Sequence, residues 1–573
     1  MKHLHGIGAS GGIAIAPLYC YRDSTLQVDR ATVDDSLAEW ERLQAALQQS
    51  VAQLEELAAD ASRRVGADNA QVFEAQAVML RDPELLKMVQ TRLFAGNLNV
   101  ETVWLEACEH YAGQLDALDD PYLRARAADV RDAAQRVLHA LLGVTSPGLT
   151  ELLQPVIVVA DSLSPSDTMG LDRSRVLGFV TARGGETSHS AILARSLGLP
   201  AVVGAGEAIF DGVDGMLAIL DGSEGLLLID PDVATLADYR RRQQVERERW
   251  RQALAQRCQP VVSTDGCAVT VLANIGSLAG AERALEAGAE GAGLLRTEFL
   301  YLERGSLPDE DEQVEVYRNI LETFGEKPVY LRTLDIGGDK ELPYLALAPE
   351  KNPALGLRGI RLSLAQGDWL KVQLRAALRA GAGRANLKII LPMVTDVSEV
   401  RRVRALLALC CGELAAEGVP FAPGVPLGCM VEVPAAALMA DELAREVDFL
   451  AIGTNDLTQY TLAADRASAD LAYLGGAFAP AVLRLVRQVI RSGRAAGKPL
   501  SLCGDLAGDP LAAPLLLGLE LRSFSMEASA IPLVKQTLSR LSAAACVPIA
   551  AAALELDGAA AVKDHLKAAL ARL

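Results

Sequence analysis

The chain has 573 residues, of which 50% are hydrophobic and only 4% are aromatic. This length exceeds a single compact domain and predicts roughly three to five folding units, with cores filled mainly by Ala, Leu and Val. The formal net charge of -18 argues against nucleic acid or an anionic membrane surface as the main partner.

Cysteine usage and hydropathy indicate the compartment. The nine cysteines form no CxxC pair, so we expect neither a disulfide framework nor a zinc site, and a reducing cytoplasm fits best. The sequence begins Met-Lys-His-Leu-His without an apolar signal core, and no stretch reaches ~18 uninterrupted apolar residues. We therefore expect no insertion into a membrane.

The first part of the chain predicts an α/β domain that is interrupted by helices. Residues 1–20 have the pattern of short strands between glycines, and apolar runs of strand length return from residue 155. Between them, apolar residues recur at helical spacing in five segments: 33–63, 68–80, 83–94, 101–117 and 122–142. We therefore expect an α/β domain made of residues 1–22 and 144–231, with a helical bundle of residues 23–143 inserted into it.

A charged segment lies between residues 232 and 258. It mixes Arg and Glu at helical spacings and contains few helix breakers. We interpret residues 232–260 as a solvated linker helix between two halves of the chain. An RNA-binding arm is the alternative interpretation.

After residue 260 one unit recurs, a short apolar run that ends in a polar or charged residue and is followed by a helical segment. The eight apolar runs are 268–273, 291–295, 329–332, 387–393, 427–432, 448–453, 499–503 and 521–524. Eight βα units predict a (β/α)8 barrel over residues 261–573, whose chemistry lies where the strands end. The side chains at those ends are Arg296, Arg332, Glu432, Asn455, Asp456 and Cys503. An open doubly wound sheet is the alternative fold.

One of the six histidines has unusual neighbours. His189 lies in Gly-Gly-Glu-Thr-Ser-His-Ser-Ala-Ile, where a glycine turn leads hydroxyl-bearing residues into the start of a helix. Backbone N–H groups at such a helix start can bind an anion, and a neutral imidazole is a nucleophile toward phosphorus. A histidine that only caps its own helix is the alternative.

Cations and carboxylates at the barrel mouth complete a second half-site. Arg and Lys side chains suit phosphate and carboxylate, and here they are Arg296, Arg332, Lys340, Arg358 and Arg466. Glu432 and Asp456 are hard oxygen ligands of the kind that Mg²⁺ shares with a phosphorylated substrate. Structural ion pairing between these groups is the alternative; together with His189 they indicate phosphoryl transfer.

Several motifs in order along the chain resemble enzyme I of the phosphoenolpyruvate-dependent sugar phosphotransferase system. Besides the sequence around His189, they are Asp335-Ile-Gly-Gly-Asp-Lys340, Asn352-Pro-x-Leu-Gly356, Met430-Val-Glu-Val-Pro434, Gly453-Thr-Asn-Asp-Leu-Thr-Gln-Tyr460 and Cys503-Gly-x-Leu-Ala-Gly-Asp509. The resemblance covers essentially the whole chain. It implies a phosphohistidine α/β domain, an inserted helical domain and a barrel that binds phosphoenolpyruvate.

The resemblance implies a role for each matched catalytic residue. His189 accepts the phosphoryl group through Nε2 and passes it to the phosphocarrier protein HPr. Cys503 protonates the enolpyruvate carbon, Arg358 neutralises charge in transit, and Thr168 hydrogen-bonds the unphosphorylated His189. From the residues alone, Cys503 is simply a buried thiol.

The resemblance also implies the binding groups and partners. Mg²⁺ is expected on Glu432 and Asp456, and the substrate is expected on Arg296, Arg332, Lys340, Asn455 and Arg466. HPr is expected on the helical bundle around Arg126, Asp129 and Arg131, the linker is expected to act as a hinge, and the barrels are expected to pair into a homodimer.

Four positions depart from the family pattern. Glu186 replaces Arg or Gln near the histidine, Asp505 replaces Glu, and Asn69 and Gln76 replace Lys and His that often line the partner surface. These departures leave open an enzyme I paralogue of a nitrogen-related regulatory phosphorelay. Pyruvate phosphate dikinase and phosphoenolpyruvate synthase carry a further nucleotide-binding domain, which we do not expect here, and an inactive scaffold is a fourth alternative.

Overall fold

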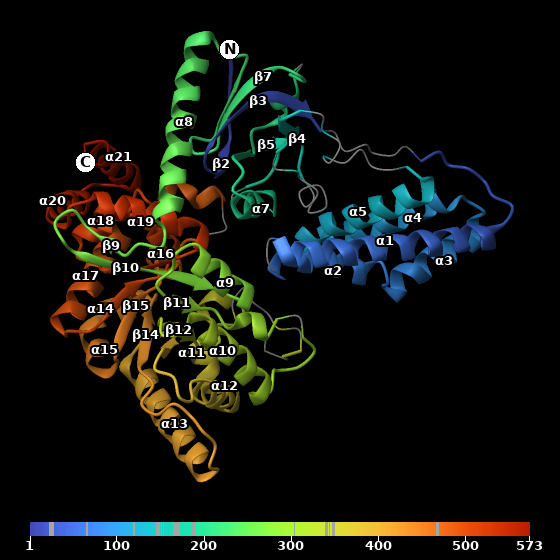
Figure 1. Ribbon diagram of the computed structural model, residues 1–573. Coiled ribbons are helices and arrows are strands. Elements are labelled where there is room, and N and C mark those ends of the chain that lie inside the picture. Colours follow the sequence, from blue (N-terminus) through green and yellow to red (C-terminus); the bar gives the residue numbers. More distant parts are fainter. Residues whose placement is uncertain are drawn as a thin grey trace. The chain divides into compact units, whose positions relative to one another are not determined.

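The computed structural model divides into two compact units, Met1–Arg247 and Glu248–Leu573 (Figure 1). The structure describes the chain except for residues 22–27, 65–66, 118–120, 145–148, 150–151, 153, 164–171, 173, 186–188, 212, 303, 338–341, 343, 346–349, 466–468 and 573. Within helices, side chains are not described at residues 59–64, 67–71, 121–126, 128, 189, 192–193, 196, 469–470 and 472.

The first unit contains an eight-stranded mixed sheet. Its strands are β1 (Lys2–His5), β2 (Ile7–Ser10), β3 (Ile13–Cys20), β4 (Val156–Ala160), β5 (Val176–Thr181), β6 (Ala201–Val203), β7 (Leu217–Asp221) and β8 (Leu226–Ile229). The order is β1-β8-β7-β3-β4-β5-β6-β2, in which β3, β4, β5 and β6 are parallel neighbours and the other pairs are antiparallel. Strand β3 therefore joins residues before and after the helical insertion in one sheet.

Strand β5 is the element of this sheet that the sequence interpretation missed. Its residues are almost all buried, so they lack the alternation that marks a half-exposed strand. Gly178 lies in the middle of the strand, where a Cβ atom would come within 2.7 Å of the Pro200 carbonyl oxygen. The glycine therefore reflects close packing inside the sheet rather than a turn.

The inserted helices form the predicted bundle. They are α1 (Ser36–Arg64), α2 (Ala67–Met79), α3 (Pro83–Gly96), α4 (Val100–Asp116) and α5 (Pro121–Leu142). At the core, Trp104 is fully buried and its Nε1 donates to the Ala134 carbonyl oxygen at 3.0 Å. Helix α3 has a capped start, because the Asp82 carboxylate accepts from two backbone N–H groups and Pro83 occupies the first turn.

Two further helices belong to this part of the chain. The short helix α7 (His189–Leu197) begins at the histidine that the sequence singles out, and α8 (Val233–Gln256) is the predicted charged linker helix. The first half of α8 is held by its own unit, since Arg242 pairs with buried Asp221 at 3.0 Å and Gln243 donates to the Ile13 carbonyl oxygen. None of the described helices is long and apolar enough to cross a membrane.

The second unit is a closed (β/α)8 barrel, as predicted. Its parallel strands are β10 (Ala268–Ile275), β11 (Ala292–Leu295), β12 (Val329–Arg332), β13 (Leu387–Leu391), β14 (Leu427–Val431), β15 (Phe449–Ile452), β16 (Leu500–Leu502) and β17 (Ser523–Met526). Strand β10 pairs with both β17 and β11, which closes the ring, and the short β9 (Val261–Val262) is antiparallel to β10. An open sheet is thereby excluded.

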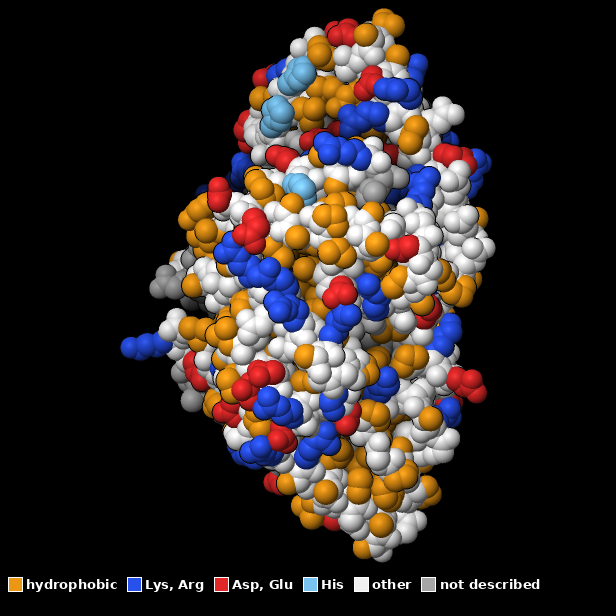
Figure 2. Space-filling view, turned by 90° about the vertical axis from the view of Figure 1, so that its left-hand side faces the viewer, with side chains coloured by type: hydrophobic (Ala, Val, Ile, Leu, Met, Phe, Trp, Pro, Cys, Tyr) orange, Lys and Arg blue, Asp and Glu red, His pale blue; other side chains and the backbone are white. Residues whose placement is uncertain are grey.

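Helices surround the barrel (Figure 1). They are α9 (Leu278–Glu286), α10 (Glu310–Phe324), α11 (Ile360–Ala365), α12 (Gly367–Ala380), α13 (Val397–Ala416), α14 (Pro434–Leu438), α15 (Ala440–Glu446), α16 (Thr454–Leu462), α17 (Pro480–Ala495), α18 (Ala513–Gly518), α19 (Ile531–Arg540), α20 (Ala543–Ala553) and α21 (Ala559–Leu570). On the face shown in Figure 2, basic and acidic side chains lie beside one another with hydrophobic side chains between them.

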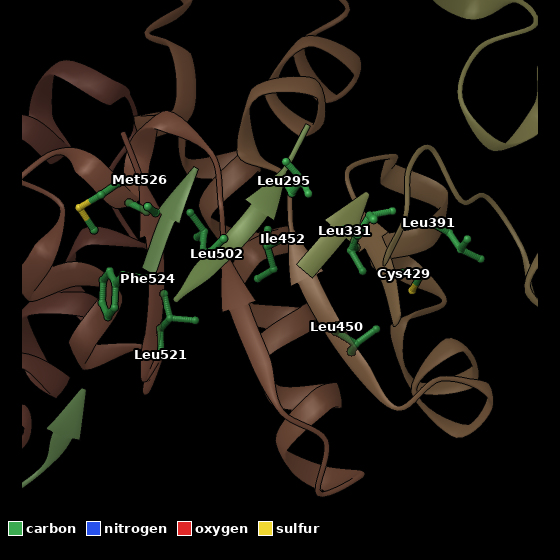
Figure 3. Close-up of a cluster of buried hydrophobic side chains, with 14 of the residues drawn as sticks. Leu295, Leu331, Leu391, Cys429, Leu450, Ile452, Leu502, Leu521, Phe524 and Met526 are labelled. Carbon is green, nitrogen blue, oxygen red and sulfur yellow. The ribbon is translucent and has the colours of Figure 1, made fainter. Parts of the chain in front are cut away.

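Alternate residues of the barrel strands face different cores. Leu295, Leu331, Leu502 and Phe524 belong to the large cluster between the strands and the helices (Figure 3). A separate inner cluster contains Leu272, Leu294, Tyr330, Ile390, Met430, Phe449, Ala451 and Cys503. Because side chains alternate along a strand, the residue two positions after an inner one also faces inward. This rule places polar side chains at the ends of several strands inside the barrel mouth.

Candidate active site

Three buried side chains lie at the ends of alternate barrel strands, β12, β14 and β16. Arg332 is the last residue of β12 and lies two positions after inward-facing Tyr330. Glu432 directly follows β14 and lies two positions after inward-facing Met430. Cys503 follows β16 directly. These three residues are only 5%, 1% and 4% exposed, respectively. The structure therefore gathers an arginine, a glutamate and a thiol at the same end of the barrel.

Arg332 is paired with two carboxylates. Its Nη2 lies 3.0 Å from Glu298 Oε1, and its Nη1 lies 3.1 Å from Asp335 Oδ2. Burial opposes the charge on the guanidinium, but the negative charges of Glu298 and Asp335 outweigh it and raise its pKa above the usual value. Among the described residues, Arg332 Nε and Glu298 Oε2 have no hydrogen-bond partner. Each of these two buried atoms therefore has an unused hydrogen-bonding position.

Arg358 connects two loops that follow different strands. Its guanidinium contacts both carboxylate oxygens of Asp335, at 3.1 and 3.2 Å, and both of Asp456, at 2.9 and 3.2 Å. The Tyr460 hydroxyl accepts a further hydrogen bond from it at 3.2 Å. Burial opposes the charge, but the two carboxylates raise the pKa of Arg358 above the usual value. Asp456 is thus held at the start of α16.

Glu432 is a buried carboxyl in an acidic setting. Its Oε1 accepts a hydrogen bond from the Met393 backbone N–H at 2.6 Å, and Met393 adopts a left-handed φ of 56° to present that group. Burial raises the pKa of Glu432, and the charges of Asp456 and Asp335 raise it further. A cation placed near these carboxylates would favour their ionised forms.

Cys503 is a neutral thiol in this site. Its backbone N–H donates to the Ile452 carbonyl oxygen at 2.9 Å, and its Sγ lies 3.5 Å from the same oxygen. Burial raises the pKa of Cys503 to about 12, and the nearby charge of Glu432 contributes. The thiol therefore keeps its proton at neutral pH.

Two further predicted residues lie at the edge of the site. Arg296 follows β11 and forms an ion pair with Glu527 at 3.3 Å, in which the side chains are 43% and 57% exposed. Asn455 lies in the first turn of α16, and its Oδ1 accepts from the Asp505 backbone N–H at 2.9 Å. The loop after Cys503 approaches this turn closely, because a Cβ atom on Gly504 would clash with Thr454 Oγ1.

Some predicted residues lie outside the described part of the chain. These are Lys340, Arg466, Thr168 and Glu186, together with the side chains of His189, Arg126 and Asn69. The backbone of His189 begins α7, as expected from its glycine-rich approach. The structure therefore brings the described barrel residues together at one mouth.

The helical bundle corrects one expectation. Gln76 is not on a partner surface: it is 0% exposed, and its amide donates to Asp132 Oδ2 at 2.8 Å. Gln76 lies on the face of α2 that is packed into the bundle core. A sequence motif alone does not show which face of a helix is buried. Arg131, half-exposed on α5, forms ion pairs with Glu109 and Asp116.

The sequence interpretation missed two carboxylates of the site. Glu298 and Asp335 are 5% and 0% exposed and hold Arg332 between them. Each lies two or three residues after an arginine that ends a strand, Arg296 or Arg332. An acidic residue so soon after a strand-end arginine is a signal that was available, because a buried guanidinium requires a counter-charge.

The buried cluster has the charge and the donor atoms of a cation site. Among the buried side chains that the structure describes at this mouth, the guanidiniums of Arg332 and Arg358 face four carboxylates, those of Glu298, Asp335, Glu432 and Asp456. This excess of buried negative charge, with all-oxygen donors, fits Mg²⁺. In the described part of the chain, no group of three or more His, Cys, Asp or Glu side chains is placed to hold a metal ion. The fit to Mg²⁺ therefore rests on the charge and the oxygen donors of these side chains.

Comparisons with known proteins agree with this architecture. Residues 250–543 match the PEP-binding domain of PEP-utilising enzymes, residues 5–126 match the N-terminal domain, and residues 152–225 match the mobile domain. The fold and site thus define a PEP-utilising enzyme.

The chain is similar over nearly its full length to curated relatives. It is 44% identical to a phosphoenolpyruvate-protein phosphotransferase of Geobacillus stearothermophilus, over 99% of this chain and 98% of the relative. It is 43% identical to the protein of that name from Bacillus subtilis (strain 168), over 95% of each. An NMR structure described as Enzyme I has 34% identity and a TM-score of 0.38, covering 43% of this chain and 99% of that one. The chain belongs to the phosphoenolpyruvate-protein phosphotransferase family, which confirms the resemblance seen in its motifs.

Proposed function

We propose that this chain takes the phosphoryl group of phosphoenolpyruvate onto His189 and passes it to HPr, as the first step of sugar uptake. The observation that carries the proposal is the buried cluster of guanidiniums, carboxylates and a protonated thiol at the barrel mouth. Its relatives named phosphoenolpyruvate-protein phosphotransferase support the same reaction.

The substrate's negative charges would be held by the cations of the mouth. Arg296 has the most exposed guanidinium of the described site arginines, and Arg332 carries the unpartnered Nε deeper inside. Arginine forks grip phosphate and carboxylate with paired hydrogen bonds. The Asn455 side-chain amide would contribute a further hydrogen bond to the substrate. By resemblance to the family, Lys340 and Arg466 would also bind the substrate.

Glu432 and Asp456 would bind Mg²⁺. Bound there, the ion would supply positive charge to the phosphate and leave part of its coordination shell to substrate oxygens and water. The acidic surroundings that raise the pKa of Glu432 support this assignment. Arg358 would keep Asp456 in place and neutralise charge as the phosphoryl group leaves.

Residues of this chain can supply both the acceptor of the phosphoryl group and the proton that completes pyruvate. His189 Nε2 forms a bond to phosphorus while the bond from phosphorus to the enolate oxygen breaks, and the bonding electrons remain on that oxygen. The enolate carbon C3 then takes the proton of the Cys503 thiol to give pyruvate, and water restores the thiol. The high pKa of Cys503 keeps that proton available. Thr168 would orient His189 before transfer.

The remaining roles follow the domain organisation. Residues 1–22 and 144–231 would carry the phosphohistidine, and residues 23–143 would bind HPr around Arg126, Asp129 and Arg131. Residues 232–260 would serve as the hinge, and residues 261–573 would bind phosphoenolpyruvate and pair into a homodimer. We place the reaction in the cytoplasm, where phosphoenolpyruvate and free thiols occur together.

The proposal is tested by following labelled phosphate from phosphoenolpyruvate. Wild-type protein with Mg²⁺ should form an acid-labile phosphoprotein and transfer the label to HPr, whereas His189→Ala should form none while still binding phosphoenolpyruvate. Retained labelling of His189→Ala would show that another residue is the acceptor. Transfer to a nitrogen-related carrier in preference to HPr would identify the regulatory paralogue instead.

A further inference from the structure

We propose that Asn274 is a positioning residue for Cys503, and that Ser525 holds the Asn274 amide in the orientation that this task requires. This inference rests on the proposed role of Cys503 as proton donor. It concerns a pair of uncharged side chains that lie outside the motifs quoted above.

The three residues form a continuous hydrogen-bonded chain inside the barrel. Ser525 Oγ donates to Asn274 Oδ1 at 2.7 Å, and Asn274 Nδ2 donates to the Cys503 carbonyl oxygen at 3.0 Å. Ser525 and Asn274 are 0% and 5% exposed. Because a carbonyl oxygen only accepts, the Cys503 contact fixes which end of the amide is which.

The strand order explains why a side chain is needed here. Strand β17 lies between β16 and β10, so Asn274 on β10 reaches Cys503 across the inner face of β17. The ladder between β16 and β17 pairs Leu502 with Phe524 and ends before Cys503. A buried carbonyl group without a ladder partner is costly, and the Asn274 amide satisfies it.

Cys503 is consequently held from several directions. Its N–H is bound by Ile452 on β15, and its carbonyl oxygen is bound by Asn274 from the opposite side. Directly after it, Gly504 lies against Thr454, where a Cβ atom would clash. With the backbone clamped, the thiol can take only a few rotamers, so its proton is delivered to one face of the enolate.

Ser525 limits the rotation of the Asn274 amide. Its hydroxyl lies close to Gly293 on β11, on the far side of β10 from β17, where a Cβ atom would come within 2.5 Å of Ser525 Oγ. The absence of a side chain at residue 293 therefore makes room for this hydroxyl. A freely rotating amide could present its oxygen to the Cys503 carbonyl, which would be repulsive.

The stereochemistry of proton transfer tests the proposal in the full-length protein. Phosphoenolpyruvate that carries deuterium stereospecifically at C3 is converted in tritiated water, and the chirality of the pyruvate methyl group is measured. We expect Asn274→Ala to lower kcat for pyruvate formation about tenfold, with KM within about threefold, and to give largely racemic methyl groups. Ser525→Ala should show the same changes in weaker form.

A matched control and a double variant separate positioning from general damage. Ser501, buried on the inner face of β16 with no hydrogen-bond partner among the described residues, provides the control Ser501→Ala, which should keep wild-type kcat and chirality. If Asn274 acts through the thiol, Asn274→Ala should cost nothing more in a Cys503→Ala background. Undiminished loss in that background, or chiral product from Asn274→Ala, would overturn the inference. An unchanged rate for Cys503→Ala alone would instead remove the proposed proton donor.

Discussion

At the scale of single residues, the site is defined by what burial does to each ionisable group. Cys503 and Glu432 have raised pKa values because both are buried beside negative charge, whereas Arg332 and Arg358 keep their charges through carboxylate partners. The consequence is a cluster in which proton positions and charge pairs are set before any substrate binds. Such pre-organisation is what phosphoryl and proton transfer require.

The raised pKa of Cys503 predicts slow alkylation. At pH 8, iodoacetamide should modify exposed Cys258 readily and leave Cys503 almost untouched, because the Cys503 thiol is protonated and buried. As the pH rises toward about 12, the modification rate of Cys503 should increase about tenfold per pH unit while the fold persists. Peptide mapping by mass spectrometry measures both rates, and equal modification of the two thiols at pH 8 would contradict the environment described for Cys503.

Removal of a buried arginine should damage the barrel far more than removal of an exposed one. Arg358→Met removes the arginine that pairs with buried Asp456 and leaves buried Asp335 with Arg332, so it should lower the free energy of unfolding by ~3–5 kcal/mol. Arg296→Met removes an exposed ion pair with Glu527 and should cost less than ~1 kcal/mol. Urea denaturation of the two variants makes the comparison, and equal losses would show that the Arg358 pairs contribute nothing beyond surface electrostatics.

At the scale of elements, the spacing of apolar residues and the positions of the polar residues and turns between apolar runs predicted most of the fold. Eight apolar runs became the eight barrel strands, and five helical segments became α1 to α5. Strand β5 was missed because nearly all of its residues are buried, which removes the alternation, and because Gly178 interrupts its apolar run. The two-residue strand β9 was missed because it is too short to carry a pattern. Both misses come from elements that tertiary contacts define.

Close packing at Gly178 predicts a position-specific glycine effect. In Gly178→Ala, the new methyl group meets the Pro200 carbonyl oxygen and the Leu220 side chain, so the free energy of unfolding should fall by ~1–3 kcal/mol. Gly113→Ala is the control, because this glycine is exposed within α4 with nothing within 4 Å, and the change should stabilise by up to ~1 kcal/mol. Thermal unfolding followed by circular dichroism measures both, and a stabilising Gly178→Ala would refute the packing argument.

At the scale of the whole molecule, the sequence predicted which strand-end residues gather at the barrel mouth but not which residues pair with them. Strand-end positions identified Arg332, Glu432 and Cys503, since a closed barrel brings those ends together. The sequence did not predict the pairing of Glu298 and Asp335 with Arg332, nor the hydrogen bond from Asn274 to Cys503. These roles depend on which loops and strands become neighbours. The burial of Gln76 was not predicted for the same reason.

Each half of the linker helix is fixed to its own unit. Arg242 and Gln243 bind residues of the first unit, whereas Arg249 donates to Thr537 Oγ1 at 2.9 Å in the second. The two units carry complementary parts of the proposed reaction, with His189 in one and the buried cluster in the other. The proposal therefore requires that the phosphoryl group cross from the barrel to the histidine.

The most direct test is to map the phosphorylated residue. After the full-length protein is mixed with phosphoenolpyruvate and Mg²⁺ at neutral to alkaline pH, fragmentation mass spectrometry should place one acid-labile phosphoryl group on His189. Glu432→Gln should greatly reduce that signal. Phosphate on any other residue, or undiminished phosphorylation of His189→Ala, would contradict the transfer from the barrel mouth to this imidazole.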